Sequence, residues 1–570
     1  MNYKKTKWWQ EAFGYQIYIR SFYDANNDGI GDLKGITQKL PYLSYLGINL
    51  IWICPFYTSP MDDYGYDISN FYGVSSEYGT IDDFIELLDS AHALNIKVII
   101  DLVLNHTSDE HPWFIESRKS KDNPYREYYL WQPPRYDELG KRKAPTNWAS
   151  FFGGSSWEYD KISNEYYLKI FSKKMPDLNW ESKLVQREMI NVARYWLDLG
   201  VDGFRVDAVA HLAKAPFIDS KITSNYEYVP DWSKFSNLPK LHKYLKILNK
   251  EVFSKKDILV VGEVGGYALI KDALQYTKPK NKELNMVFNF DHNWCNNAWS
   301  ANNRDELIIN VSHLKEMFNK WQEGLYKKAW NALYWLNHDQ PRVLTHYGDE
   351  KKYHTESGKA LATALYFMWG TPFIYNGEEI GMTNPYFKTI EDFNDISFIT
   401  QYHLNVLAGA DAFTYIQKAS LTSRDNARTL MQWDDSLNGG FTKGIPWNMI
   451  NDNYQMINVS NQIKKQNSIL QYYRKIIYLR LKSKYRDIII KGDYQQVWLD
   501  HTQVYAYIRS YKKQKILVIV NLTKQEAIVE SFVFGIKTII LNNMNKDLTI
   551  KDHHLILQPY EAYVLELKGE

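Results

Sequence analysis

At 570 residues the chain exceeds one ordinary hydrophobic core, so two or three domains are expected. Its 68 Lys and Arg residues nearly balance 66 Asp and Glu residues, and the formal charge of +2 gives no reason to expect a nucleic-acid or membrane partner. The two cysteines, Cys54 and Cys295, exclude a disulfide framework, and because the N-terminus also lacks a signal-like apolar run, a cytoplasmic protein is expected.

Eight strand-like runs alternate with helix-like stretches along most of the chain. They are residues 15–19, 49–53, 97–102, 203–206, 258–262, 285–289, 332–335 and 372–375. Most are continuous apolar runs, which is typical of strands buried on both faces. Eight strand–helix units predict an α/β fold of the (β/α)8 TIM-barrel type. An open doubly wound sheet is the alternative, but no glycine-rich phosphate-binding motif follows the first strand.

Two of the helix-like stretches carry clear start or stop signals. Apolar residues recur at helical spacing from Val185 to Leu199, and Gly200 follows as a stop. Thr80 stands three residues before Asp83, which is the spacing of a capping box and predicts a helix start.

The alternation of strands and helices is interrupted twice. Residues 105–176 are rich in Trp, Tyr and Gly and contain a hairpin-like stretch at 159–172, which predicts a small domain inserted after the third strand. After about residue 490 the strand-like runs follow one another without helices, which predicts a C-terminal antiparallel β-sandwich domain. The predicted domains are the barrel at 1–104 and 177–488, the insertion at 105–176, and the β domain at 489–570.

Three apolar runs end in a carboxylate, at Asp207, Glu263 and Asp339. Because a carboxylate is unstable inside a packed core, each is expected where its strand emerges. Other polar residues stand beside these strand ends: they are His106, Arg205 and His338. A lone strand-end Asp is usually a cap or part of an ion pair. This whole set at the mouth of one barrel predicts an active site.

The chemistry of glycosidic bond cleavage suits these residues, because it needs one carboxylate as nucleophile and another as proton donor. Arg205 lies on the same strand face as Asp207 and is expected to keep that carboxylate ionised. Glu263 follows an apolar run, which is expected to raise its pKa and suits a general acid. Asp339 is expected to stabilise positive charge on the sugar ring. For the two histidines, binding of ring hydroxyls, structural packing and metal ligation all stay open.

The chain resembles the α-amylase superfamily, glycoside hydrolase family 13, and within it the oligo-1,6-glucosidase and α-glucosidase branch, over essentially its whole length. The matching segments are Asp101-Leu-Val-Leu-Asn-His106, Met175-Pro-Asp-Leu-Asn-Trp180, Gly203-Phe-Arg-Val-Asp207, Gly262-Glu263, Asn337-His-Asp-Gln-Pro-Arg342, Gly377-Glu-Glu-Ile-Gly-Met-Thr-Asn384 and Ser423-Arg-Asp-Asn-Ala-Arg428. The resemblance implies a retaining mechanism, with Asp207 as nucleophile, Glu263 as acid/base and Asp339 as transition-state stabiliser. It also implies that Asp63, Tyr66 and Arg424 contact the terminal glucose, and therefore exo-action on short oligosaccharides.

The bond specificity rests on the residue after the nucleophile. Relatives that resemble 1,6-specific enzymes often carry Val there, and those that resemble α-1,4 maltases carry a smaller residue. Ala208 therefore favours α-1,4 substrates such as maltose, although it could also simply suit local packing. The alternatives are an oligo-1,6-glucosidase, a trehalose-6-phosphate hydrolase with Lys169 as a weak phosphate-binding candidate, or a sugar isomerase or transglycosylase. A non-catalytic carbohydrate-binding relative is disfavoured, since all three carboxylates are present.

A polar stretch after the first strand places oxygen ligands at alternate positions, as in the first half of a calcium loop. The bidentate Glu that ends such loops is missing, because position 35 is Gly. A polar turn is the alternative. The family resemblance favours a structural Ca2+ held by Asp24, Asn26, Asp28, the Ile30 carbonyl and Asp32.

Overall fold

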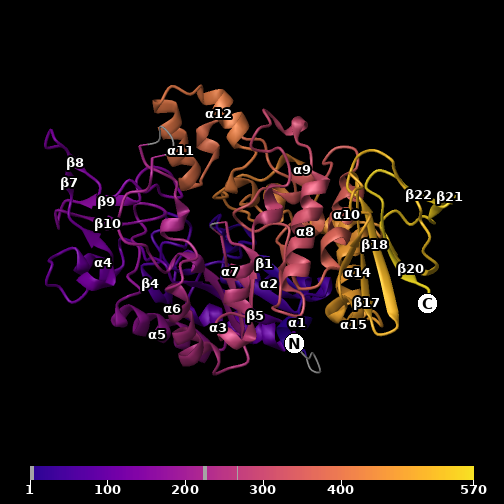
Figure 1. Ribbon diagram of the computed structural model, residues 1–570, viewed down its shortest axis with the longest axis horizontal. Coiled ribbons are helices and arrows are strands. Elements are labelled where there is room, and N and C mark those ends of the chain that lie inside the picture. The colour runs from indigo at the N-terminus through magenta and orange to yellow at the C-terminus, as the bar shows by residue number, and fades with distance from the viewer. Residues whose placement is uncertain (1–5, 223–226, 266, 570) are drawn as a thin grey trace.

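A single sheet of eight parallel strands lies at the centre of the computed structural model, which describes residues 6–222, 227–265 and 267–569 (Figure 1). The strands are β1 (Gly14–Ile17), β2 (Leu50–Ile53), β5 (Lys97–Val103), β11 (Gly203–Asp207), β12 (Leu259–Glu263), β13 (Met286–Phe288), β14 (Ala332–Leu333) and β15 (Thr371–Tyr375). Their order is β13-β12-β11-β5-β2-β1-β15-β14. The prediction of an eight-stranded parallel barrel is confirmed.

The two ends of this sheet meet through side chains. The ring of Phe288, in β13, lies 5.0 Å from the ring of Tyr334, directly after β14. The Tyr334 hydroxyl donates a 2.6 Å hydrogen bond to the carbonyl oxygen of Asn289. At the start of β11, Gly203 has a φ of +145°, and an added Cβ would lie 1.9 Å from the Leu259 carbonyl oxygen. Only glycine therefore permits the close pairing of β11 with β12 that sets two catalytic candidates side by side.

Helices lie outside the strands, one after each strand in the chain. They are α2 (Leu33–Leu46), α3 (Ile81–Ala93), α5 (Lys183–Leu199), α6 (Leu241–Leu248), α7 (Ile270–Thr277), α8 (Val311–Leu325), α10 (His354–Tyr366) and α14 (Ile469–Leu481). The capping box predicted at Thr80 and Asp83 begins α3. Gly200 ends α5 in the left-handed conformation, with a φ of +116°.

Between β5 and α5 the chain leaves the barrel and forms a small antiparallel sheet of β6 (Trp131–Gln132), β10 (Glu165–Leu168) and β9 (Trp157–Asp160). Buried Trp148, Trp157 and Leu168 belong to a small hydrophobic core in this region. The segment also contains α4 (Pro112–Ser117) and the hairpin of β7 (Arg135–Tyr136) and β8 (Arg142–Lys143). It lies at one end of the molecule (Figure 1). The domain boundaries at 105 and 176 stay a prediction.

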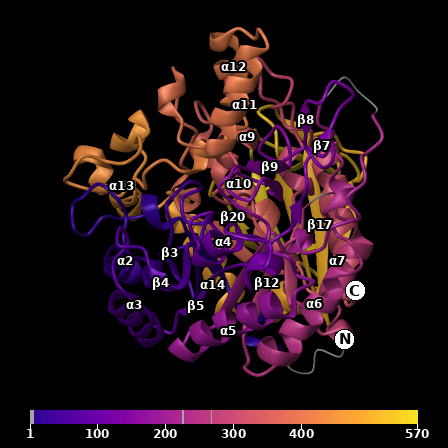
Figure 2. The same cartoon turned by 90° about the vertical axis from the view of Figure 1, so that its left-hand side faces the viewer.

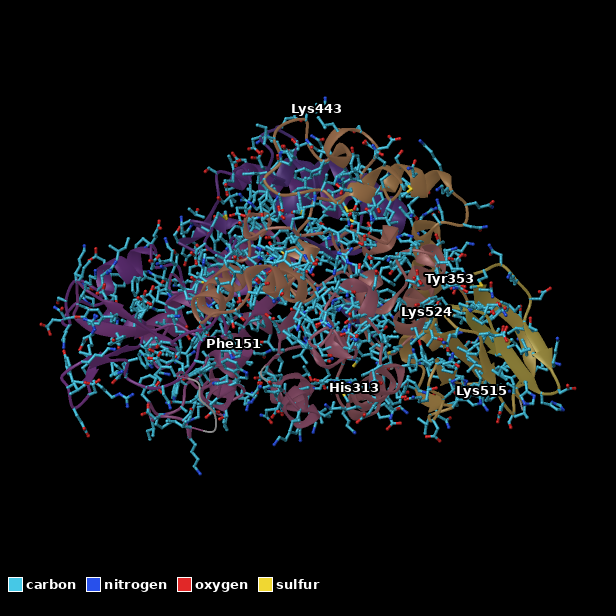
Figure 3. The ribbon with its side chains drawn as sticks, turned by 90° about the horizontal axis from the view of Figure 1, so that it is seen from above. Phe151, His313, Tyr353, Lys443, Lys515 and Lys524 are labelled. Atoms are coloured by element: carbon cyan, nitrogen blue, oxygen red, sulfur yellow. The ribbon has the colours of Figure 1, made fainter. Side chains whose placement is uncertain are left out.

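The C-terminal region forms two antiparallel sheets, as the strand-like runs predict. The larger contains β16 (Gln495–Val497), β17 (Val504–Tyr511), β18 (Gln514–Asn521), β23 (Ala562–Leu567) and β20 (Ile536–Asn542). The smaller contains β19 (Ala527–Val529), β22 (His554–Leu557) and β21 (Thr549–Lys551). Seen from above, Phe151 of the inserted segment and Lys515 and Lys524 of the C-terminal sheets lie toward opposite ends of the molecule (Figure 3).

A pair of helices that the sequence patterns did not predict rises above the barrel between β15 and α14. The helices are α11 (Ile396–Leu407) and α12 (Ala412–Ala419), drawn in orange (Figures 1 and 2). Their base contains a separate small hydrophobic cluster of Phe387, Phe393, Phe398 and Ile416. These helices stand beside the mouth of the barrel.

Candidate active site

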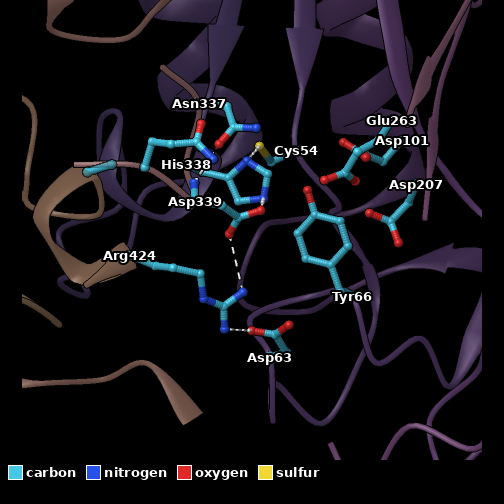
Figure 4. A network of polar contacts seen from close by, with 12 residues as sticks. Cys54, Asp63, Tyr66, Asp101, Asp207, Glu263, Asn337, His338, Asp339 and Arg424 are labelled. Carbon is cyan, nitrogen blue, oxygen red and sulfur yellow. Dashed lines mark hydrogen bonds and ion pairs between the residues drawn. The ribbon is translucent and has the colours of Figure 1, made fainter. Parts of the chain in front are cut away.

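Most of the residues predicted for catalysis and substrate binding line one cavity of about 280 Å³. Asp207 ends β11, Glu263 ends β12, and Asp339 follows β14. The predicted residues that line the cavity are Asp63, Tyr66, His106, Asp207, Glu263, Asp339 and Arg424. Arg205 and His338 are buried directly behind them. Figure 4 shows Asp207 and Glu263 on one side of the Tyr66 ring, and Asp339 with Arg424 on the other.

The buried Arg205 guanidinium organises three carboxylates. Its Nη1 lies 2.7 Å from Asp207 Oδ1 and also contacts Asp101, while its Nη2 contacts Glu263. Its centre lies 5.0 Å from the ring of Trp52. Asp101 was missed as a functional residue, although a carboxylate in the middle of a buried strand was a signal that could have identified it.

That Arg205 keeps Asp207 ionised stays a prediction, because a second effect opposes Arg205 in the structure. Burial raises the pKa of Asp207 well above its usual range, and Arg205 acts against this effect. Glu263 and Asp101 raise that pKa further. Burial likewise raises the pKa of Asp101 to about 6 in spite of Arg205. One guanidinium is thus shared by three carboxylates, and burial of Asp101 and Asp207 acts against their ionisation.

Glu263 occupies a more open position than its apolar approach along β12 predicts. Its carboxylate contacts Arg205, and one oxygen lies 3.5 Å from the main-chain nitrogen of Ala208. The Glu263 side chain is 21% exposed, compared with 10% for Asp207. The Glu263 carboxyl group therefore meets the cavity, where a leaving group and a water molecule can reach it.

Asp339 has the opposite electrostatic setting. Arg424 Nη1 lies 3.2 Å and Arg428 Nη2 lies 2.8 Å from its Oδ1, and His338 Nε2 lies 3.3 Å from its Oδ2. Burial acts to raise the pKa of Asp339, but His338, Arg424 and Arg428 together lower it well below its usual range. Asp339 is therefore a permanent anion at the cavity wall. Arg428 was missed as a site residue, although it ends the segment that contains Arg424.

His338 is held rigidly and is neutral at physiological pH. Its ring is stacked between Tyr66 and Tyr18, with centroid distances of 5.2 and 5.9 Å. Burial lowers its pKa to about 3. Gln16 Nε2 lies 2.8 Å from His338 Nδ1, and because an amide nitrogen only donates, the imidazole proton is on Nε2, toward Asp339. The sequence patterns did not single out Gln16.

His106 also lines the cavity as a neutral imidazole. Burial lowers its pKa to about 3, and Lys214 adds to this effect. Its Nε2 has no hydrogen-bond partner in the part of the chain that the structure describes. A buried nitrogen without a partner at the cavity wall is suited to a substrate hydroxyl.

Asp63 and Arg424 close one side of the cavity. Arg424 Nη2 lies 3.0 Å from Asp63 Oδ1, and the two appear joined in Figure 4. The same guanidinium contacts Asp395, another residue that the sequence patterns did not single out. The cavity is thus walled by fixed charges with hydrogen-bonding capacity, as binding of a hydroxyl-rich ring requires.

Of the two residues predicted to affect substrate specificity, Ala208 lines the cavity and Lys169 does not. Ala208 lines the cavity and adopts a left-handed conformation with a φ of 45°, where a β-branched residue is strained. Lys169 is buried, and burial lowers its pKa to about 8. Lys169 does not line the cavity, so nothing in its position supports the phosphate-binding alternative.

The predicted calcium loop is a run of polar turns beside residues 441–444. Asp24 accepts hydrogen bonds from the Gly29 amide at 2.8 Å and the Thr442 hydroxyl at 2.6 Å, and Asp32 accepts one from the Ala25 amide at 3.0 Å. These oxygens are chemically suited to Ca2+. Within residues 6–222, 227–265 and 267–569, however, no three His, Cys, Asp or Glu side chains gather as metal ligands. The calcium site stays a prediction.

Comparisons with known proteins agree with this geometry. The model of the α-amylase catalytic domain matches residues 16–492. The chain is 45% identical to an oligo-1,6-glucosidase of Parageobacillus thermoglucosidasius, over 98% of this chain and 99% of that protein. Among solved structures, a trehalose-6-phosphate hydrolase of Bacillus licheniformis gives a TM-score of 0.89 at 39% identity, covering 99% and 100% of the two chains. An isomaltulose synthase of Protaminobacter rubrum gives 0.91 at 38%, with the same coverage.

Among the described residues, no helix is both long enough and apolar enough to cross a membrane.

Proposed function

The chain belongs to the α-amylase family of glycoside hydrolases, and from this premise we propose that it is a retaining, exo-acting α-glucosidase that releases glucose from short oligosaccharides. The observation that carries the proposal is the arrangement around Arg205. Two carboxylates from adjacent strands contact one buried guanidinium, and the permanently ionised Asp339 lies across the cavity from them. The different surroundings of the three carboxylates suit the three roles that retaining cleavage requires, which are nucleophile, acid/base and stabilising anion.

In the proposed first step, an Asp207 oxygen attacks the anomeric carbon while Glu263 gives its proton to the glycosidic oxygen. The glycosidic bond breaks, and the glucose is left bonded to Asp207. In the second step Glu263 takes a proton from water, the water oxygen attacks the same carbon, and Asp207 is released as a carboxylate. Asp339 stabilises the positive charge that develops on the ring in both steps.

The single shared proton must be on Glu263 when the reaction begins. We propose that the group holds one proton, because burial raises the pKa of Asp207 in spite of Arg205. A glycosidic oxygen at Glu263 would stabilise the protonated form of that residue by accepting its hydrogen bond. Asp207 then becomes the ionised partner of Arg205, at 2.7 Å. Substrate binding is therefore proposed to place the proton on the correct carboxylate.

The proposed exo-action rests on the ion pair of Asp63 and Arg424. It closes one side of the cavity with fixed polar groups, which suits the hydroxyls of a terminal glucose. A chain that continued past this ring would have to displace a buried ion pair.

For linkage we propose a preference for α-1,4 bonds, supported by the small side chain of Ala208 at the cavity wall. The second candidate is an α-1,6 preference. It is favoured by the name of the Parageobacillus relative, an oligo-1,6-glucosidase that is 45% identical to this chain. The choice between the α-1,4 and the α-1,6 preference therefore rests on Ala208.

The test is a substrate panel of maltose, isomaltose, sucrose, trehalose and trehalose 6-phosphate, with products identified by chromatography. We expect glucose from maltose with retained α-configuration, and slower release from isomaltose. Cleavage of isomaltose alone would replace the α-1,4 preference by the α-1,6 candidate, and an isomeric sugar product from sucrose would replace hydrolysis by isomerisation. Asp207→Asn is the control, because it removes the nucleophile and should abolish turnover while the protein stays folded.

A further inference from the structure

One short loop, residues 59–67, supplies two buried residues of the catalytic cavity. They are Asp63 and Tyr66. Asp63 forms the ion pair with Arg424, and the Tyr66 ring is stacked on the imidazole of His338 (Figure 4). The conformation of this loop therefore decides where two of the proposed glucose contacts lie.

The backbone of the loop is strained. Met61 and Tyr64 have φ values of 65° and 46°, in the left-handed region that residues with a side chain rarely adopt. At Gly65 the φ is +106°, and an added Cβ would lie 2.8 Å from the Pro55 carbonyl oxygen. Strained backbone of this kind persists only where neighbouring groups hold it in place. The structure must therefore contain groups that fix this loop.

The carboxylate of Asp67, which is completely buried, accepts hydrogen bonds from the loop. Its Oδ2 accepts a 2.8 Å hydrogen bond from the Asp62 amide, and its Oδ1 accepts one of 3.0 Å from the Asp63 amide. The Ser59 hydroxyl donates a third, at 3.0 Å, and itself accepts one of 3.0 Å from the Met61 amide. One carboxylate thus holds three successive main-chain amides, two directly and one through Ser59.

The charge state of Asp67 decides how firmly the amides are held. Burial raises the pKa of Asp67 to about 7, and the charges of Asp62 and Asp63 act in the same direction. The hydrogen bonds from the amides of Asp63 and Asp62 lower this pKa, because they stabilise the ionised form. Measurements on the loop are therefore best made at pH 8, where most of this carboxyl group is ionised.

We propose that Asp67 is a positioning residue for the terminal glucose, because its carboxylate fixes the loop that places Asp63 and Tyr66. The inference rests on the proposed α-glucosidase function and deepens it, since it assigns part of the affinity for the terminal ring to a residue outside the cavity wall. Asp67 itself does not line the cavity. Its loss should therefore weaken substrate binding and leave the chemical step intact.

The test compares wild type with Asp67→Asn at pH 8, on the glucoside that the wild type cleaves best. Asn keeps the shape of the side chain but turns an N–H donor toward the main-chain amides. We expect KM to rise about tenfold while kcat changes less than about twofold, and the inhibition constant of free glucose to rise about as much as KM. A purely structural role would instead reduce the number of active molecules, which lowers kcat and leaves KM unchanged.

Asp83→Asn is the matched control. Asp83 also accepts hydrogen bonds from a main-chain amide and a hydroxyl, both of Thr80 and both 2.8 Å long, but it lies at the start of α3. This variant should keep the wild-type KM. Ser59→Ala removes a single donor of the Asp67 carboxylate and should raise KM about twofold to threefold. It provides the same test with a milder change if Asp67→Asn does not fold.

Amide hydrogen exchange of the loop, followed by mass spectrometry, is a second measurement that needs no enzymatic activity. The amides of Met61, Asp62 and Asp63 should exchange about tenfold faster in Asp67→Asn than in wild type, and at the wild-type rate in Asp83→Asn. Unchanged exchange overturns the role of Asp67, and so does an unchanged KM, whatever happens to kcat. A wild type that cleaves no glucoside contradicts the proposed function itself, and the exchange rates still decide whether Asp67 holds the loop.

Discussion

At the scale of single residues, the carboxylates of the site have two different electrostatic surroundings. Asp101, Asp207 and Glu263 share one guanidinium, that of Arg205. Asp339, in contrast, has two arginines beside it, and His338 Nε2 lies 3.3 Å away. Since Asp207 and Asp339 are both largely buried, the number of cations beside each of them decides whether its pKa lies above or below the usual range. These different surroundings suit the different roles that are proposed for the carboxylates.

The proton on His338 Nε2 depends on Gln16. Replacement of this amide by a carboxylate, Gln16→Glu, supplies an acceptor at Nδ1 and moves the imidazole proton there. His338 Nε2 then faces Asp339 with a lone pair, and the 3.3 Å contact between them turns from favourable to repulsive. We expect kcat to fall about tenfold or more, since a buried polar group left without a matching partner costs on the order of 1–3 kcal/mol.

The measurement is the 15N spectrum of histidine-labelled protein, with His338→Asn used to assign the signal. Wild type should show a neutral ring protonated at Nε2, and Gln16→Glu should show the proton at Nδ1. Gln16→Met removes the donor without adding an acceptor and is the matched control. An unchanged tautomer in Gln16→Glu with reduced kcat would show that Gln16 acts only through packing.

The sequence was sufficient to predict which residue types line the site, but not how they are paired. Strand-end carboxylates could be identified because their strands are continuous apolar runs. Gln16 and His338 are separated by 322 positions, so no local pattern relates them. The raised pKa of Asp207 was unpredictable for a similar reason, because it depends on burial in the folded protein and on repulsion from Glu263 and Asp101, which lie far away in the sequence.

At the scale of elements, a buried carboxylate joins β15 to two helices. Glu378, in the helical turn that follows β15, accepts a 2.8 Å hydrogen bond from Tyr473 of α14 and another from Tyr366 of α10. Its second oxygen has no hydrogen-bond partner among the described residues. Burial raises the pKa of Glu378 to about 8, so this side chain is protonated at neutral pH.

Glu378 therefore makes the stability of the folded protein fall as the pH becomes alkaline. Its pKa in the folded protein exceeds the unfolded value of about 4.3, so its stabilising contribution is complete below that value and is lost as pH rises through 8. Complete ionisation costs on the order of 5 kcal/mol. We expect Glu378→Gln to reduce the fall in Tm between pH 6 and pH 9.5, measured by calorimetry. Glu391→Gln, at a fully exposed site, is the control and should follow the wild-type curve.

The predicted calcium loop gives a second test at this scale. If Ca2+ binds through Asp24, Asp28 and Asp32, removal of the ion with EGTA should lower Tm by several degrees, and added Ca2+ should restore it. The Asp28→Ala variant should have the lower Tm even in excess Ca2+. Identical Tm values with and without EGTA, in protein that elemental analysis shows to be free of calcium, would favour the polar turn.

Element prediction succeeded where one face of an element is buried and failed for α11 and α12. The helix that ends at Gly200 buries a regular apolar stripe and was predicted from its spacing. Helix α11 buries Phe398 alone, and α12 buries Ile416 alone. With so few buried positions, hydrophobic periodicity carries little information about these helices.

At the scale of the whole molecule, the barrel and the C-terminal sheets share one hydrophobic core. Tyr505 and Tyr507 of β17 pack with the barrel helices, and the Tyr507 hydroxyl donates a 3.1 Å hydrogen bond to the Ala364 carbonyl of α10. The ring of Tyr505 lies 5.6 Å from that of Phe318 in α8. The C-terminal region is therefore expected to stabilise the catalytic barrel from behind.

Arg509 of β17 is the polar centre of this contact. It is fully buried, and its guanidinium donates to three main-chain carbonyls, those of Asp493, Gly492 and Phe367. Phe367 is the C-cap of α10, and Gly492 is the C-cap of α15 (Arg486–Lys491). One cation from the C-terminal sheet thus satisfies carbonyls at two helix C-termini, where positive charge is favoured.

Arg509→Met should therefore weaken the barrel as well as the sheet. Buried carbonyls left without donors cost about 3 kcal/mol in total, so the urea midpoint should fall clearly. Because the core is shared, loss of α-glucosidase activity and loss of tryptophan fluorescence should follow the same shifted curve. Lys537→Met, which removes a surface ion pair from a side chain that is 59% exposed, should leave the midpoint within about 0.5 kcal/mol of wild type. Activity that outlasts an early unfolding step of the C-terminal sheet would show instead that the two regions fold independently.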